Sequence, residues 1–154
     1  MKRRRCLLFT SAPLALLLGT PSLARADAFA EARLARGIDA VRTKRYSEAS
    51  DQFRIACFGL LDEPILLTEG LVRLTLAQEA AGRRADVEKT LERFLDVERR
   101  FAVYAKSRLD APTREGFQAL LRARLPADVI AAVPSLAALS GKTGDPGAET
   151  RKKP

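Results

Sequence analysis

The chain has 154 residues, of which 47% are hydrophobic and 30% charged, the composition of a soluble globular protein of about one domain. It contains no histidine, which excludes Ser-His-Asp and Cys-His catalytic arrangements and histidine-based metal sites. The formal charge is +8, but five of the 27 basic residues precede Asp27, which leaves 22 basic against 19 acidic residues. Such a balanced remainder excludes the clustered cations of a nucleic-acid-binding surface, so we expect no nucleic-acid partner.

Residues 1–26 have the three zones of a secretory signal. A basic start is followed by an apolar run from Cys6 to Gly19 and by the small-residue end Ala24-Arg25-Ala26. This pattern predicts cleavage after Ala26 and a periplasmic or secreted protein without stable membrane insertion after cleavage. An uncleaved N-terminal anchor is the alternative, and the pair Arg4-Arg5 leaves open whether export follows the general or the twin-arginine route.

Cleavage would remove Cys6 and leave Cys57 as the single cysteine of the mature chain. No intramolecular disulfide is then possible, so the fold must depend on its hydrophobic core. Cys57 has two interpretations: a small buried hydrophobic side chain, or the partner in an intermolecular disulfide.

The mature chain is predicted to be all-helical, because helix-forming residues dominate and apolar side chains recur at helical spacing. Gly59, Pro64, Gly82, Pro112 and Pro126 mark expected helix ends, and Ser47 is the expected N-cap of the second helix. The predicted helices are 27–42, 47–58, 65–81, 86–101 and 112–124, with one or two helical turns in 127–139. We expect an irregular segment over 103–112, one domain over 27–139 and a disordered tail over 140–154.

An internal repeat connects the two predicted hairpins. Ala49, Phe53 and Ala56 of the second helix recur as Val87, Leu91 and Phe94 in the fourth, each 38 residues later. With Gly37 and Tyr46, the first set resembles the tetratricopeptide repeat. In that family small side chains allow the two helices of a hairpin to approach closely, and aromatic side chains fill the space between hairpins.

This resemblance implies antiparallel hairpins stacked as a short α-solenoid of about two degenerate repeats with C-terminal capping helices. Segment 111–124 and the turns after Pro126 are the candidate caps, since terminal repeats need a cover. Phe117, Leu120 and Leu121 are expected to cover the open side of the second hairpin.

The resemblance also implies a concave groove for a peptide or partner protein, lined by the first helix of each hairpin. The principal partner-binding candidates carried over by position are Glu31, Arg42, Glu69, Leu76 and Glu79. Further positions on the same two faces are Leu34, Ile38, Val41, Val72 and Ala80. For the apolar members core burial is an equal alternative, and for the charged members an ordinary solvated face.

The sequence has no C-x-x-C pair and no Gly-rich phosphate loop, and its carboxylates fit solvated helix faces. We therefore expect no enzyme, cofactor or metal, and the leading hypothesis is an exported, non-catalytic protein–protein interaction module. One alternative is a structural protein that forms a homo-oligomer through exposed helix faces or Cys57. Another is a carrier of small apolar ligands, with a cavity lined by Leu67, Leu71, Leu91 and Phe117.

Overall fold

The computed structural model describes residues 23–140, and the regular secondary structure in this range is entirely helical. The helices are α1 (Leu23–Arg42), α2 (Tyr46–Gly59), α3 (Pro64–Ala80), α4 (Arg84–Phe101), the 3₁₀ helix η1 (Tyr104–Lys106), α5 (Ala111–Arg124), α6 (Ala127–Ala131) and α7 (Ala137–Ser140). The predicted all-α class is therefore confirmed. The predicted tail from residue 141 onward and the predicted signal up to residue 22 lie outside the described residues.

The helices begin and end within a few residues of their predicted bounds, with one correction at the start of α2. Ser47 is not the N-cap, because the helix begins at Tyr46 and Arg45 occupies the cap position without a side-chain cap. The turn closes earlier than predicted since Lys44 adopts a positive φ of 59° and the Arg45 N–H bonds to the Ala40 carbonyl. The left-handed residue reverses the chain and places Arg45 at the helix start.

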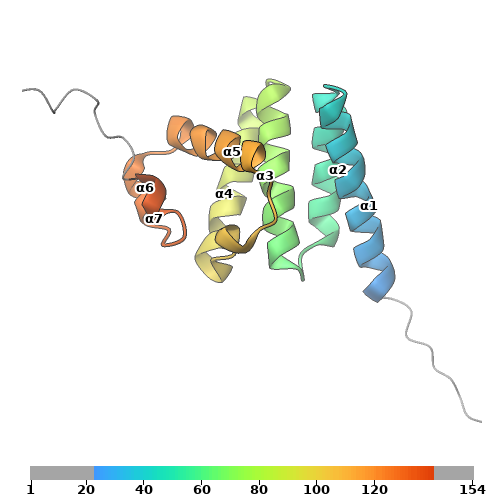
Figure 1. Ribbon diagram of the computed structural model, residues 1–154, viewed down its shortest axis with the longest axis horizontal. Helices are drawn as coiled ribbons and strands as arrows, with labels where there is room; N and C mark the ends of the chain where they lie inside the picture. The colour runs from blue at the N-terminus through green and yellow to red at the C-terminus, as the bar shows by residue number, and fades with distance from the viewer. Residues whose placement is uncertain (1–22, 141–154) are drawn as a thin grey trace, which may run out of the picture.

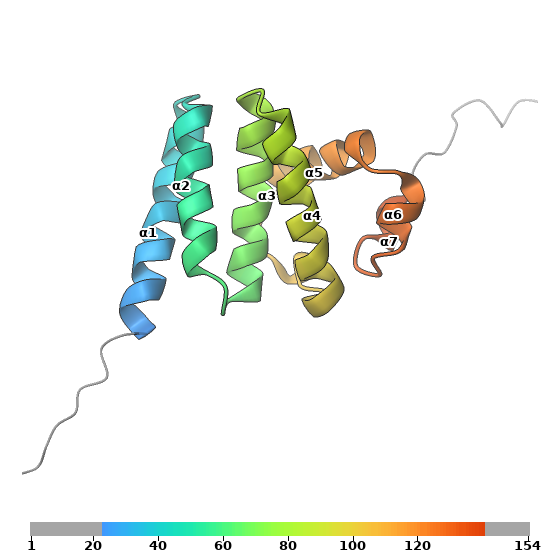
Figure 2. The ribbon, with the colours of Figure 1, turned by 180° about the vertical axis from the view of Figure 1, so that it is seen from behind.

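Helices α1 to α4 form two antiparallel hairpins that stand side by side, each helix packed on its neighbours in sequence (Figures 1 and 2). Pro64 occupies the first turn of α3, as predicted, and Gly82 takes a φ of +73° in the turn before α4. Helix α5 then lies across α3 instead of running alongside it as a third hairpin would (Figure 1). The short helices α6 and α7 follow at the end of α5.

Small residues set the spacing of α1, α2 and α3. Gly37 is buried, and a Cβ atom at its position would lie 2.4 Å from a ring carbon of Phe53. A Cβ at Gly70 of α3 would lie 2.8 Å from the Cys57 sulfur. These helices pack so closely that only a hydrogen fits at Gly37 and Gly70.

An aromatic cluster joins the second hairpin to α5. The ring of Phe117 packs edge-on against Phe94, with centroids 4.8 Å apart, and Tyr104 lies 5.7 Å from Phe94. Leu120 and Leu121 are also buried. The expectation that these residues of α5 cover the second hairpin is therefore confirmed, and the cluster explains why α5 turns across the hairpin.

A buried carboxylate holds the C-terminal segment in place. Glu98 is 1% exposed, and one of its oxygens accepts hydrogen bonds from the N–H groups of Val103 and Tyr104 at the end of α4. The Ser135 hydroxyl donates to the other oxygen at 2.7 Å. Glu98 thus satisfies backbone donors after α4 and connects them to the segment between α6 and α7.

Candidate functional site: a groove between α1, α3 and the start of α5

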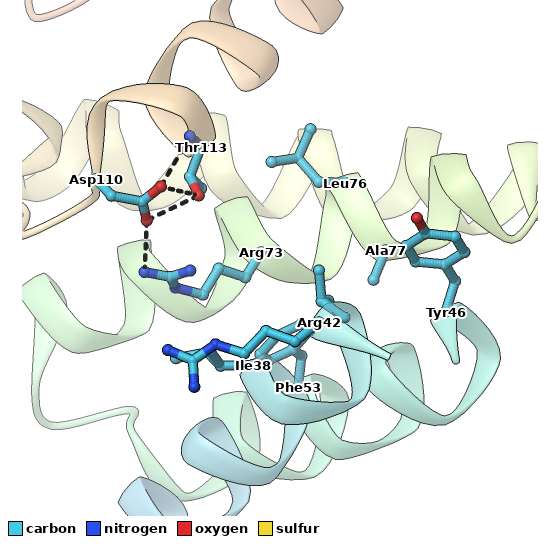
Figure 3. A pocket seen from close by; sticks show the side chains of 10 residues that line it. Ile38, Arg42, Tyr46, Phe53, Arg73, Leu76, Ala77, Asp110 and Thr113 are labelled. Atoms are coloured by element: carbon cyan, nitrogen blue, oxygen red, sulfur yellow. Dashed lines mark hydrogen bonds and ion pairs between the residues drawn. The ribbon is translucent and has the colours of Figure 1, made fainter. Parts of the chain in front are cut away.

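A groove of about 520 Å³ opens between the first helices of the two hairpins. Its walls come from the C-terminal half of α1, the middle of α3, two side chains of α2 and the first residues of α5, as Figure 3 shows. The lining residues are Ile38, Val41, Arg42, Tyr46, Phe53, Arg73, Leu76, Ala77, Asp110 and Thr113. This volume lies within the range of small-molecule and peptide side-chain pockets.

Apolar side chains form the floor of the groove. Phe53 and Ala77 are almost fully buried beneath it, Ile38 and Leu76 are half-buried, and Val41 is 39% exposed. Because the apolar surface at Val41 and Leu76 stays open to solvent, covering it with an apolar ligand group would release water and favour binding.

Two arginines lie at one end of the groove. Arg42 comes from α1 and Arg73 from α3, and both guanidinium groups extend toward the end where Asp110 lies (Figure 3). Arg42 pairs with Asp39 at 3.2 Å, with about three quarters of its side chain exposed, so this pair contributes little to stability. The Arg73 side chain is only 17% exposed.

Asp110 closes this end because it starts α5. Its carboxylate caps the helix by accepting hydrogen bonds from the N–H of Thr113 at 3.2 Å and from the Thr113 hydroxyl at 2.8 Å. It also receives a hydrogen bond from Arg73 at 3.3 Å. The Thr113 hydroxyl in first place, and Arg73 in addition, lower the pKa of Asp110, so this carboxylate is ionised at neutral pH.

Some of the five principal residues predicted from the sequence line the groove, and others lie outside it. Arg42 and Leu76 line the groove, whereas Glu31 lies exposed on α1 outside it. Glu79 is paired with Arg124 of α5 at 2.6 Å and does not line the groove. Two of the five candidates are therefore brought together.

Glu69 requires a correction, because it is not on an open surface. It is 7% exposed and its carboxylate accepts a hydrogen bond from the N–H of Arg108. Among the secondary candidates, Ile38 and Val41 line the groove. Val72 is fully buried in the core, and the partly buried Leu34 packs against that core. Ala80 is exposed outside the groove.

Sequence reasoning missed Arg73, Asp110 and Thr113. Asp110 followed three residues later by Thr113 is a recognisable helix start, so the cap could have been predicted. Arg73 lies one turn before Leu76 on α3 and could have been placed on the groove face by its spacing. Their meeting could not be predicted, because it joins residues 37 apart through the crossing of α5.

The buried position of Cys57 corrects its second interpretation. The side chain is fully buried between α2 and α3, and burial raises the pKa of the thiol to about 12. A protonated, enclosed sulfur cannot form a disulfide with a second chain without local unfolding. The small-hydrophobe interpretation therefore holds in the folded state.

The residues named for the cavity of an apolar-ligand carrier lie in the hydrophobic core. Leu67, Leu71, Leu91 and Phe117 are all buried in the core cluster, and none of them lines the groove.

No family model, curated protein or solved structure matches the chain significantly. Within residues 23–140, no three His, Cys, Asp or Glu side chains are grouped so that they could hold a metal ion. The helices in the same range are all too short or too polar to cross a membrane.

Proposed function

We propose that this protein is an exported, non-catalytic interaction module that receives a segment of a partner protein in the groove between α1, α3 and α5. In this proposal the two hairpins are degenerate tetratricopeptide-like repeats, and α5 to α7 cap them. The observation that carries the proposal is the groove itself: an apolar floor left open at Val41 and Leu76, beside the charged groups Arg42, Arg73 and Asp110.

The size and shape of the groove favour a polypeptide segment with one or two inserted side chains. A volume of about 520 Å³ is too small for a folded domain, whereas an extended segment can lie along it and continue outside. Because the contact area is small, we expect weak binding that is strengthened by further contacts or by several copies.

The test is recovery of a partner from envelope extract by the immobilised protein. Leu76→Lys places a charge on the groove floor and should abolish recovery, as should reversal of the exposed Arg42 (Arg42→Glu). Ala80→Lys is the matched control, since Ala80 is exposed on the same helix outside the groove. Circular dichroism melts verify that each variant is folded.

Recovery of no partner, or of partners that bind Leu76→Lys and Ala80→Lys equally, would argue against the groove as the binding site.

Self-association is the second candidate function, and exposed apolar residues at one end of the hairpins favour it. Phe58 at the end of α2 is 74% exposed, Leu61 in the following turn 56%, and Phe101 at the end of α4 50%. The end of α2 and the end of α4 lie at the same end of the molecule (Figures 1 and 2). Exposed apolar patches commonly mark protein interfaces.

Sedimentation velocity separates the two functions. A homo-oligomer that Phe58→Asp dissociates would support self-association, whereas a monomer at high concentration would exclude it. In the mature chain expected after cleavage, reductant should have no effect on either result, because its single cysteine, Cys57, is buried.

A further inference from the structure

Arg73 has fewer hydrogen bonds than its burial calls for. A guanidinium carries five N–H donors, yet Arg73 donates one hydrogen bond to a carboxylate, at 3.3 Å. Its Nε atom is buried and has no hydrogen-bond partner among the described residues. The Arg73 side chain, which is only 17% exposed, therefore lines the groove with N–H donors that no described residue accepts.

Asp110 shows that Arg73 binds a carboxylate. It leaves some of the N–H donors of Arg73 unused, because its own oxygens have other partners. The group that binds Arg73 from the groove wall is the side-chain carboxylate of Asp110, not the carboxylate of a chain end. However, its two oxygens are also engaged by the N–H and hydroxyl of Thr113, which hold it at the start of α5. A second carboxylate that is free to move in the groove could use the remaining donors.

Arg42 adds a second cation from the opposite wall. Its guanidinium reaches toward the same end of the groove as that of Arg73, while Leu76, Ala77 and Tyr46 lie toward the other end (Figure 3). The only partner of Arg42 among the described residues is the exposed Asp39, a weak surface pair that a ligand can replace. One end of the groove thus holds two arginines, each paired with one aspartate, and the other end is apolar.

We propose that the groove selects an internal peptide segment in which an Asp or Glu side chain stands beside an apolar residue. The carboxylate binds Arg73 and Arg42, and the apolar side chain covers Val41 and Leu76. This inference rests on the proposed interaction function and names the chemistry of its partner. Arginine suits the role because its planar donors engage both oxygens of a carboxylate.

The geometry also makes Asp110 a competitor of the ligand. Its negative charge occupies part of Arg73 and repels an arriving carboxylate. Asparagine caps helices about as well as aspartate, so Asp110→Asn should keep α5 in place while it frees Arg73. This variant is therefore expected to bind acidic segments several-fold more tightly than the natural chain.

The experiment selects ligands from a random heptapeptide library displayed inside a loop, so that neither peptide end is free. The full-length protein is the bait, alongside Arg73→Gln, Arg42→Gln and Asp110→Asn. Arg54→Gln is the matched control, because Arg54 is an exposed arginine of α2 outside the groove. Selected peptides and their Asp→Asn or Glu→Gln counterparts are then compared by fluorescence anisotropy.

We expect the natural chain and Arg54→Gln to enrich peptides with Asp or Glu next to an apolar residue. Their affinity should fall at least about tenfold when the carboxylate becomes an amide. Arg73→Gln should lose the acid preference even if it is less stable, and the exposed Arg42→Gln should weaken it.

The inference is overturned if acid and amide peptides bind equally, if Arg42→Gln and Arg73→Gln both select the same acidic sequences, or if no peptide is enriched. Enriched peptides that lack acidic residues but are lost with Leu76→Lys would leave the interaction function standing and refute only the acid preference.

Discussion

Replacing Gly37 by alanine is expected to destabilise the protein, although alanine is the better helix former. A Cβ at this position would lie 2.4, 2.6 and 2.9 Å from three ring atoms of Phe53, whereas carbon atoms in contact sit about 3.5–4 Å apart. The Phe53 ring is 1% exposed and would have to move by about 1 Å in a packed core.

The size of the effect is the difference between two opposing terms. Overpacking of a core costs about 1–3 kcal/mol, and the gain in helix propensity from glycine to alanine is about 1 kcal/mol. We expect a net loss of up to about 2 kcal/mol for Gly37→Ala. The midpoint of thermal unfolding should fall by up to about 8 °C, and urea unfolding should give the same change in free energy.

Gly116→Ala is the matched control. Gly116 is also helical, but a Cβ there would have its nearest neighbour at 3.8 Å, an ordinary contact with Leu76. This variant should gain about 0.5–1 kcal/mol.

A double-mutant cycle with Phe53→Leu identifies the cause. If the ring is the obstacle, Gly37→Ala should cost at least about 1 kcal/mol less in the Phe53→Leu background. The reasoning is refuted if Gly37→Ala is as stabilising as Gly116→Ala, or if the cycle shows no coupling.

Substitutions of three buried residues test the core. Phe117→Ala should cost about 3–5 kcal/mol in urea unfolding, because it empties the contact between α5 and the second hairpin; a loss below 1 kcal/mol would mean that α5 does not cover the core. Glu98→Ala should destabilise more than Glu98→Gln, since glutamine keeps an oxygen for the backbone donors after α4; equal losses would contradict this role. The pKa of Cys57 is about 12 in the folded chain against an ordinary 9.0, so burial of the neutral thiol stabilises the fold below pH 9, and this contribution disappears as the pH rises toward 12. The difference in urea midpoint between Cys6→Ala and the double variant Cys6→Ala, Cys57→Ala should therefore shrink over that interval, and a constant difference would contradict the burial.

Helix positions and the interior of the first hairpin were predictable because both depend on local patterns. Pro64 and Gly82 mark the ends of helices through their own backbone preferences, the fixed φ of proline and the freedom of glycine to take a positive φ, which act without any tertiary context. Gly37 of α1 and the spacing of Ala49 and Phe53 in α2 indicated the facing sides of the first hairpin, and all three residues are buried. The predicted N-cap Ser47 was the exception. A positive φ at Lys44 moved the start of α2, and lysine is not a residue type from which a positive φ can be predicted.

From the sequence, only the helix faces that line the candidate site could be predicted. The resemblance to the tetratricopeptide repeat implied that Arg42, Ile38 and Val41 of α1 and Leu76 of α3 face the groove, and the structure brings these four together. The same resemblance put Glu69 on that side, yet the segment before α5 folds over it and the Arg108 N–H binds its carboxylate. A face of a helix can be read from spacing, but not what later covers it.

By itself, the sequence determined an all-helical chain, most of its helix boundaries and the small residues that let α1 and α2 pack closely. The tertiary structure alone decided the direction of α5, and with it the groove end where Arg73 meets Asp110. The physical reason is the distance along the chain over which each interaction acts. Helix propensity and capping act over a few residues, whereas the crossing of α5 results from the packing of Phe117 against Phe94 and from contacts between side chains more than 20 residues apart, whose geometry no local pattern encodes.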